Sequence, residues 1–264
     1  MKMVRCSLVF LLATLVLLNS CVSRKKLTYL QYLDKTEKNV PEGEIGRTSV
    51  TPNAYKILPY DNLYIRVITP DPEWSALFNI MPVGAGGTIT EESVALFGYP
   101  VDLEGYIEIP FVGKIEAGGK TLAEVKSELD SIFRNYLTEA AITIRLVNNY
   151  VSVIGEVSRP GRYLLTKDRV NVFEALALAG DMNAFGSRNN VKLIRPSPYG
   201  PVIKEFSLED RSIMTSEFYY IMPNDIIYAM PLNRKSFEIN ASVWTMLLNT
   251  ITSALGVIAF FRTL

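Results

Sequence analysis

Short stretches of alternating or continuous apolar residues run through the middle of the chain and predict β-strands. Successive side chains of a strand point to opposite faces, so a period of two predicts one buried face. The predicted strands lie at 63–67, 107–109, 142–146, 191–194, 202–206 and 226–228. Residues 69–99 show no regular period and are predicted to be irregular.

Two helices are predicted from capping boxes, in which an N-cap side chain is followed three residues later by a glutamate. The boxes are Thr121 with Glu124 and Asn171 with Glu174. The apolar face of the first helix consists of Leu122, Val125, Leu129, Ile132, Phe133 and Tyr136. Gly180 is placed to end the second helix.

These elements predict an α+β fold in two units, because short hairpins of strands come with one helix in each unit. A turn at Arg159-Pro160-Gly161 lies in the second unit, with Gly161 predicted to have a positive φ. The predicted boundaries are 1–20 for a signal peptide, 21–52 for a tether, 53–148 and 149–232 for the two units, and 233–264 for a C-terminal helix.

The N-terminus has the pattern of a secretory signal, with Lys2 and Arg5 ahead of an apolar run over 8–18. It closes with Leu18-Asn19-Ser20-Cys21, which resembles the bacterial lipobox, so Cys21 is the expected lipidation site. An ordinary signal peptide cleaved near Cys21 and an uncleaved anchor are the alternatives. Cys6 would leave with the signal, and no intramolecular disulfide would then be possible.

The C-terminus carries 21 consecutive uncharged residues, 241–261. A helix of that length would reach ~32 Å, enough to cross the hydrocarbon of a bilayer. The interpretation is therefore a C-terminal transmembrane helix.

Small and polar residues recur in this segment at steps of three and four, on one side of the expected helix. They are Ser242, Thr245, Asn249, Thr252 and Gly256. Polar groups in hydrocarbon must meet other helices or water, so the stripe predicts a lumen or a helix interface in a ring of copies. A simple anchor helix and an amphipathic helix lying on the membrane surface are the alternatives.

Composition excludes several function classes. The chain of 264 residues has 27 Lys plus Arg against 27 Asp plus Glu, and this balance argues against a nucleic-acid partner. Histidine is absent, which excludes Ser-His-Asp triads and imidazole-ligated metals. A glycoside hydrolase using carboxylates such as Asp102 and Glu104 is a weak alternative, because both residues sit beside a predicted turn. We therefore expect no enzyme activity, no cofactor and no metal.

Two motifs lie in the first unit. The run 55–67, YKILPYDNLYIRV, is similar to a pattern YxIgpGDxLxIxV, with Asp61 in place and Tyr60 where glycine is usual. The run 102–113, DLEGYIEIPFVG, is similar to a pattern GxIxlPxiG and contains Gly105, Pro110 and Gly113. With these two motifs the chain resembles the outer-membrane polysaccharide export family, in which the first pattern opens the domain.

The second unit resembles the SLBB domain, a β-grasp module common in these exporters. The matching residues are 153–157 with 160–163, then 174–180, then 187–195. Gly155, Pro160, Gly161 and Gly180 are matching positions with expected structural roles, and Asp181 stands where the family usually has a second glycine.

The resemblance implies a lipid-anchored outer-membrane protein with its body in the periplasm. It implies a ring of copies, typically eight, that lets capsular polysaccharide or exopolysaccharide cross the outer membrane. An inner-membrane polysaccharide copolymerase would dock to the ring. The alternative is a membrane-anchored periplasmic scaffold or glycan-binding lipoprotein without a pore.

Overall fold

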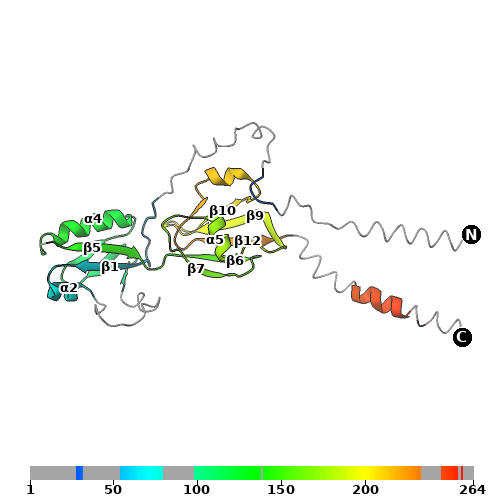
Figure 1. Cartoon of the computed structure of the whole chain (residues 1–264), viewed down its shortest axis with the longest axis horizontal. Helices are drawn as coiled ribbons and strands as arrows, with labels where there is room; N and C mark the ends of the chain where they lie inside the picture. The colour runs from blue at the N-terminus through cyan, green and yellow to red at the C-terminus, as the bar shows by residue number, and fades with distance from the viewer. Residues whose placement is uncertain are drawn as a thin grey trace, which may run out of the picture.

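The computed structural model describes residues 28–31, 54–79, 98–137, 139–232, 245–254 and 257. Most of them form two domains that follow one another along the chain and lie side by side (Figure 1). Each domain has its own core of buried apolar side chains. The connection between the domains is short, because β5 (Ala141–Leu146) ends the first and β6 (Tyr150–Gly155) begins the second.

The first domain is built on a three-stranded antiparallel sheet in the order β2-β1-β5. The strand β1 (Asn62–Ile68) lies in the middle and β2 (Tyr99–Pro100) on one edge. Leu63, Ile65 and Val67 of β1 are buried, which confirms the alternation in the sequence. A separate hairpin is formed by β3 (Tyr106–Ile109) and β4 (Gly113–Glu116).

The helix α4 (Leu122–Phe133) packs on this domain and begins at the predicted capping box. Thr121 Oγ1 accepts from the Glu124 backbone N–H, and the Glu124 carboxylate accepts from the Thr121 N–H. Val125, Leu129 and Phe133 are buried in the core. Tyr136 lies beyond the end of the helix and is exposed, so its predicted place on the buried face is wrong.

The second domain contains a five-stranded sheet in the order β10-β9-β12-β6-β7. Its central pair, β12 (Ile226–Pro231) and β6, is parallel, and the other pairs are antiparallel. The remaining strands of this sheet are β7 (Gly161–Leu164), β9 (Gly186–Arg195) and β10 (Val202–Phe206). All three predicted strands at 191–194, 202–206 and 226–228 fall within these elements.

The helix α5 (Val172–Leu178) starts at the second predicted capping box, where Asn171 Oδ1 accepts from the Phe173 and Glu174 N–H groups. It ends as predicted at Gly180, which has φ 75° and donates to Ala177 O. A two-stranded ladder of β8 (Val170–Asn171) and β11 (Tyr220–Ile221) and the short 3-10 helix η4 (Arg211–Thr215) complete the domain.

The predicted C-terminal transmembrane helix is wrong. The structure describes helical residues at 245–254 and at 257. Within the described part of the chain, no helix is both long enough and apolar enough to cross a membrane.

Two local predictions also need correction. The segment 69–99 is not wholly irregular, because it contains the helix α2 (Pro72–Phe78) and the first residue of β2. Asp71 caps α2 by accepting from the Glu73 N–H, and Pro72 occupies the first turn, where proline is well tolerated. Gly161 has no positive φ and is the first residue of β7. The chain therefore enters this strand without the left-handed turn residue that was expected.

Candidate functional site at the domain junction

The two domains meet around the buried carboxylate of Asp61, directly before β1. Asp61 Oδ2 accepts from the Tyr55 hydroxyl at 2.7 Å and from the Leu58 N–H at 2.9 Å, both in the first domain. Asp61 Oδ1 accepts from Asn148 Nδ2 at 2.8 Å and from Asn224 Nδ2 at 3.4 Å. Asn148 is in the connector and Asn224 precedes β12, so one carboxylate joins three parts of the chain.

The backbone around these side chains completes the junction. The Asn224 N–H donates to Tyr150 O at 2.7 Å, and the Asn62 N–H donates to Asn148 Oδ1 at 3.1 Å. Burial, together with the negative charge of Asp61, raises the pKa of the Tyr55 hydroxyl far above its usual value. Tyr55 therefore remains a neutral donor, which is the form that the Asp61 carboxylate requires.

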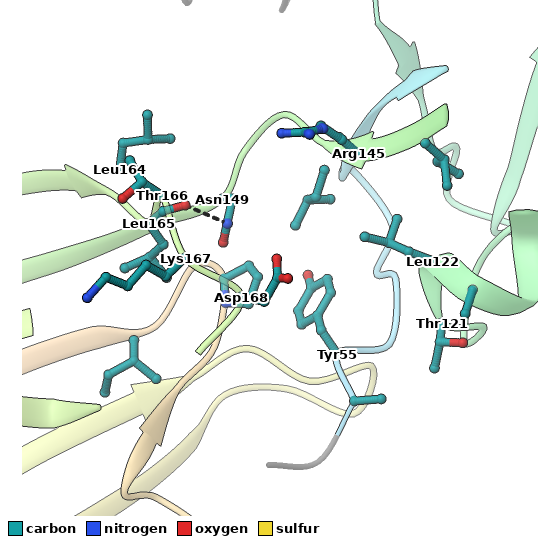
Figure 2. A pocket seen from close by; sticks show the side chains of 16 residues that line it. Tyr55, Thr121, Leu122, Arg145, Asn149, Leu164, Leu165, Thr166, Lys167 and Asp168 are labelled. Carbon is teal, nitrogen blue, oxygen red and sulfur yellow. Dashed lines mark hydrogen bonds between the residues drawn. The ribbon is translucent and has the colours of Figure 1, made fainter. Parts of the chain in front are cut away.

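A groove of about 1130 Å³ opens beside this junction. Figure 2 shows the side chains of Thr121, Leu122 and Arg145 from the first domain on one side and those of 164–167 from the second domain on the other. Tyr55 and Asp168 lie between them. Asn149 is held in place because its Nδ2 donates to Leu165 O at 2.8 Å.

The groove combines hydrogen-bonding groups with apolar walls. Hydroxyl, amide and guanidinium groups come from Thr121, Thr166, Asn149 and Arg145, and the apolar surface comes mostly from leucines and isoleucines. Arg145 is exposed, and Lys167 forms an ion pair with Glu174 at 3.3 Å. This mixture fits a hydroxyl-rich ligand, which offers many donors and acceptors beside apolar carbon.

Asp102, one of the two carboxylates proposed for hydrolysis, has local structural partners. Asp102 Oδ1 accepts from the Glu104 N–H at 3.0 Å and from the Tyr106 N–H at 2.7 Å, and its other oxygen lies 3.9 Å from Lys114 Nζ. Asp102 therefore closes the turn into β3. Among the residues that the structure describes, no group of three His, Cys, Asp or Glu side chains is arranged to hold a metal ion.

The other motif residues are spread over both domains rather than gathered in one site. Gly105, Gly113 and Gly155 have positive φ values of 89°, 96° and 91°. A Cβ on Gly155 would lie 2.1 Å from Ala229 O, so this position also needs glycine for close approach to β12. Pro110 follows β3 and Pro160 precedes β7. Of all these motif residues, only Asp61 lies at the junction.

Several predicted site residues lie outside the described part of the chain, namely Cys21, Ser242 and Gly256. Thr245, Asn249 and Thr252 belong to the helix over 245–254 and are exposed. The Thr252 hydroxyl donates to Leu248 O at 2.9 Å and to Asn249 O at 3.0 Å. Because its hydroxyl is paired within the helix, Thr252 has less need of a polar partner outside it than the sequence pattern indicated.

Three of the four residues at the centre of the junction were not predicted from the sequence, namely Tyr55, Asn148 and Asn224. Tyr55 belongs to the first motif, but nothing in its spacing links its hydroxyl to Asp61. Asn224 lies in a turn of the type expected before a strand and has φ 64°, a conformation that asparagine tolerates. That signal predicts a turn and says nothing about a partner 163 residues away.

Two known protein families match the chain, in regions that follow one another as the two structural domains do. Residues 49–147 match the family described as polysaccharide biosynthesis/export protein, and residues 150–206 match the SLBB domain. The junction around Asp61 thus joins the first matched region to the domain that contains the second.

Two named relatives match part of the chain. Over 102 residues it is 31% identical to the "EPS I polysaccharide export outer membrane protein EpsA" of Ralstonia nicotianae, covering 37% of this chain and 27% of the relative. Over 113 residues it is 31% identical to the "Capsule polysaccharide export outer membrane protein CtrA" of Neisseria meningitidis, covering 42% of this chain and 28% of the relative. The matched part therefore spans less than a third of each relative's length.

Proposed function

Because residues 49–147 match the family described as polysaccharide biosynthesis/export protein, we propose that the chain is a subunit of a channel that exports capsular polysaccharide or exopolysaccharide across the outer membrane. The observation that carries the proposal is the pairing of this domain with an SLBB domain in one chain. The names of EpsA and CtrA support an outer-membrane location and a polysaccharide cargo. The family consists of transport proteins, so the proposed role involves no catalysis.

The proposed channel is a ring of copies of this chain, lipid-anchored at Cys21 with its body in the periplasm. An inner-membrane polysaccharide copolymerase is the proposed partner that delivers the polymer. Exposed apolar side chains of the first domain offer contacts for such partners, because Leu103 and Phe111 are 71% and 75% exposed. A membrane-crossing C-terminal helix is not part of this proposal.

The test is deletion of the gene in its own host, followed by measurement of polysaccharide at the cell surface and in the periplasm. We expect surface polymer to be lost and to return when the intact chain is supplied. Undiminished surface polymer in a strain that has no second copy of such a gene would contradict the proposal. Electron microscopy of the protein extracted from outer membranes tests the ring, which single protomers in that extract would exclude.

The groove at the junction favours one alternative, a glycan-binding lipoprotein without a pore. Its hydroxyl, amide and guanidinium groups suit a carbohydrate chain, whether or not the protein forms a ring. Arg145→Ala should weaken binding of the purified protein to the host's polysaccharide if the groove holds it. If this variant binds poorly while export continues at the normal rate, the groove serves binding and not transport.

A further inference from the structure

Residues 28–31 lie on the second domain, although they precede both domains in the sequence. In Figure 1 this dark-blue segment is found beside the second domain and away from β1. The Leu30 N–H donates to Leu208 O at 3.0 Å, the Gln31 N–H donates to Glu209 O, and Arg211 Nε donates to Leu30 O at 3.0 Å. Gln31 also forms a parallel bridge with Asp210. The segment is therefore held as an extra strand-like piece of the second domain.

The side chain of Tyr29 makes the main contacts between this segment and the second domain. Its ring packs edge-on against Phe173 of α5 with centroids 5.8 Å apart, and the Arg188 guanidinium lies 4.9 Å from its centroid. Its hydroxyl donates to Asp181 Oδ1. Burial, and next the hydrogen bond to Asp181, raise the pKa of Tyr29, so the hydroxyl keeps its proton at any physiological pH. Tyr29 and Leu30 both pack against the core of the second domain.

Two of these residues have unfavourable backbone conformations that the contacts must offset. Leu30 has φ 53° and Asp181 has φ 69°, both in the left-handed region. Asp181 occupies the position where the resembling domains usually have glycine, which would adopt this φ without strain. Here its carboxylate accepts from both the Met182 N–H at 2.6 Å and the Tyr29 hydroxyl. The aspartate thus provides an acceptor for Tyr29 that glycine would lack.

We propose that residues 28–31 form a clasp that fastens the N-terminal segment to the second domain, so that the lipid on Cys21 holds this domain close to the membrane. The inference rests on the proposed lipid anchor. From Cys21 to Thr28 the chain has seven residues, which reach at most ~25 Å, whereas the 33 residues from Cys21 to Ala54 reach ~115 Å. The clasp therefore shortens the reach of the chain between the lipid and the folded domains by a factor of about five.

Amide hydrogen exchange of the full-length protein tests the clasp itself. Tyr29→Phe removes only the hydroxyl, and Asp181→Gly removes the acceptor while relieving the strained φ. We expect the amides of Leu30 and Gln31 to exchange about tenfold faster in both variants, because local opening becomes easier. Tyr199→Phe is the matched control, since Tyr199 is fully exposed.

Unchanged exchange at Leu30 and Gln31 in Tyr29→Phe and Asp181→Gly would overturn the clasp. Exchange of the β6 and β12 amides serves as the folding control, because a general loss of protection would show that the second domain itself had loosened. Tyr29→Ala, which also removes the ring contacts, should expose the segment fully while leaving those sheet amides protected.

Two alternative insertions test whether the clasp sets the distance between the second domain and the membrane. A flexible insert of about 15 residues adds up to roughly 50 Å of reach. We would place it either between Lys26 and Leu27, before the clasp, or between Glu42 and Gly43, after it. The lipidated protein, labelled at Tyr199→Cys, is bound to vesicles containing an acceptor lipid, and energy transfer to the membrane is measured.

Only the insertion before the clasp should reduce energy transfer, and in a Tyr29→Ala background both insertions should reduce it. Equal effects of the two insertions in the otherwise unchanged protein would overturn the role of the clasp. Protein that fails to bind vesicles through Cys21 would also overturn it. None of these measurements uses polymer export, so failure of the export proposal would be recognised separately, in the deletion strain.

Discussion

Most residues with a strained backbone conformation lie where distant parts of the chain are in contact. Six residues other than glycine have a positive φ in the described ranges, and these are Leu30, Tyr60, Phe111, Glu139, Asp181 and Asn224. A residue with a Cβ is disfavoured by about 1–2 kcal/mol in this conformation. Four of the six belong to or adjoin the junction and the clasp. Contacts across the sequence therefore hold conformations that local preferences oppose.

Tyr60 gives the simplest test of this strain. It has φ 69° at the third position of a turn that starts at Leu58, where the Asp61 N–H donates to Leu58 O, and this position favours glycine. The Tyr60 side chain is 75% exposed, so little packing would be lost on truncation. We expect Tyr60→Gly to stabilise the protein by about 0.5–1 kcal/mol, measured by urea denaturation.

Tyr60→Ala separates the two effects, because alanine also lacks the ring but keeps the unfavourable Cβ. It should leave the stability within about 0.5 kcal/mol of the unchanged protein. If alanine stabilises as much as glycine does, the gain comes from losing the exposed ring and not from relief of the backbone.

At the scale of elements, the helices show what local sequence can and cannot predict. Both capping boxes were predictable, because Thr121 with Glu124 and Asn171 with Glu174 carry the whole signal within four residues. The start of α2 was present in the sequence as Asp71-Pro72-Glu73, but seven residues are too few for a helical period to stand out. The transmembrane helix was mispredicted, because an uncharged stretch such as 241–261 does not by itself make a membrane-spanning helix.

The capping box of α5 predicts a dependence of stability on pH. The backbone N–H of Asn171 donates to the Glu174 carboxylate at 2.9 Å and lowers the pKa of Glu174 below its usual value. A lowered pKa in the folded state adds stability above the unfolded pKa of about 4.3, and that stability is lost as pH falls through the folded pKa. Glu174→Gln should therefore reduce the melting temperature by about 2–4 °C at pH 7 and by less at pH 3.

Glu104→Gln is a suitable comparison, because it makes the same charge change in a turn of the first domain, outside any helix cap. Its melting temperature should differ little from that of the unchanged protein at both values of pH. An equal difference between Glu174→Gln and the unchanged protein at pH 7 and pH 3 would mean that the charge of Glu174 does not contribute to the cap.

At the scale of the whole molecule, the arrangement of the two domains was beyond what the sequence could predict. Most strands and both capped helices follow from patterns a few residues long, whereas the junction joins Tyr55, Asp61, Asn148 and Asn224. These side chains are polar, and their spacing in the sequence does not indicate a contact. Only folding brings them together. Asp61 itself was identified because it belongs to a motif, but its role in joining the domains was not.

The junction makes a testable prediction about domain orientation. Four donors share the Asp61 carboxylate, and Asp61→Asn replaces it with an amide. Because buried donors then lose their partner, we expect the free energy of unfolding to fall by about 2–4 kcal/mol. Asn224→Ala removes only the 3.4 Å contact from the second domain and should cost less than about 1 kcal/mol.

Small-angle X-ray scattering of the two variants shows whether this contact also fixes the orientation. We expect the maximum dimension to increase in Asn224→Ala at nearly unchanged stability, because the domains gain freedom about the short connector between Leu146 and Tyr150. Asn149→Ala, which loses a hydrogen bond to Leu165 on the second domain's side of the groove, is the matched control and should scatter like the unchanged protein. If Asn224→Ala, Asn149→Ala and the unchanged protein scatter identically, packing around the groove holds the domains together, and the Asp61 carboxylate does not.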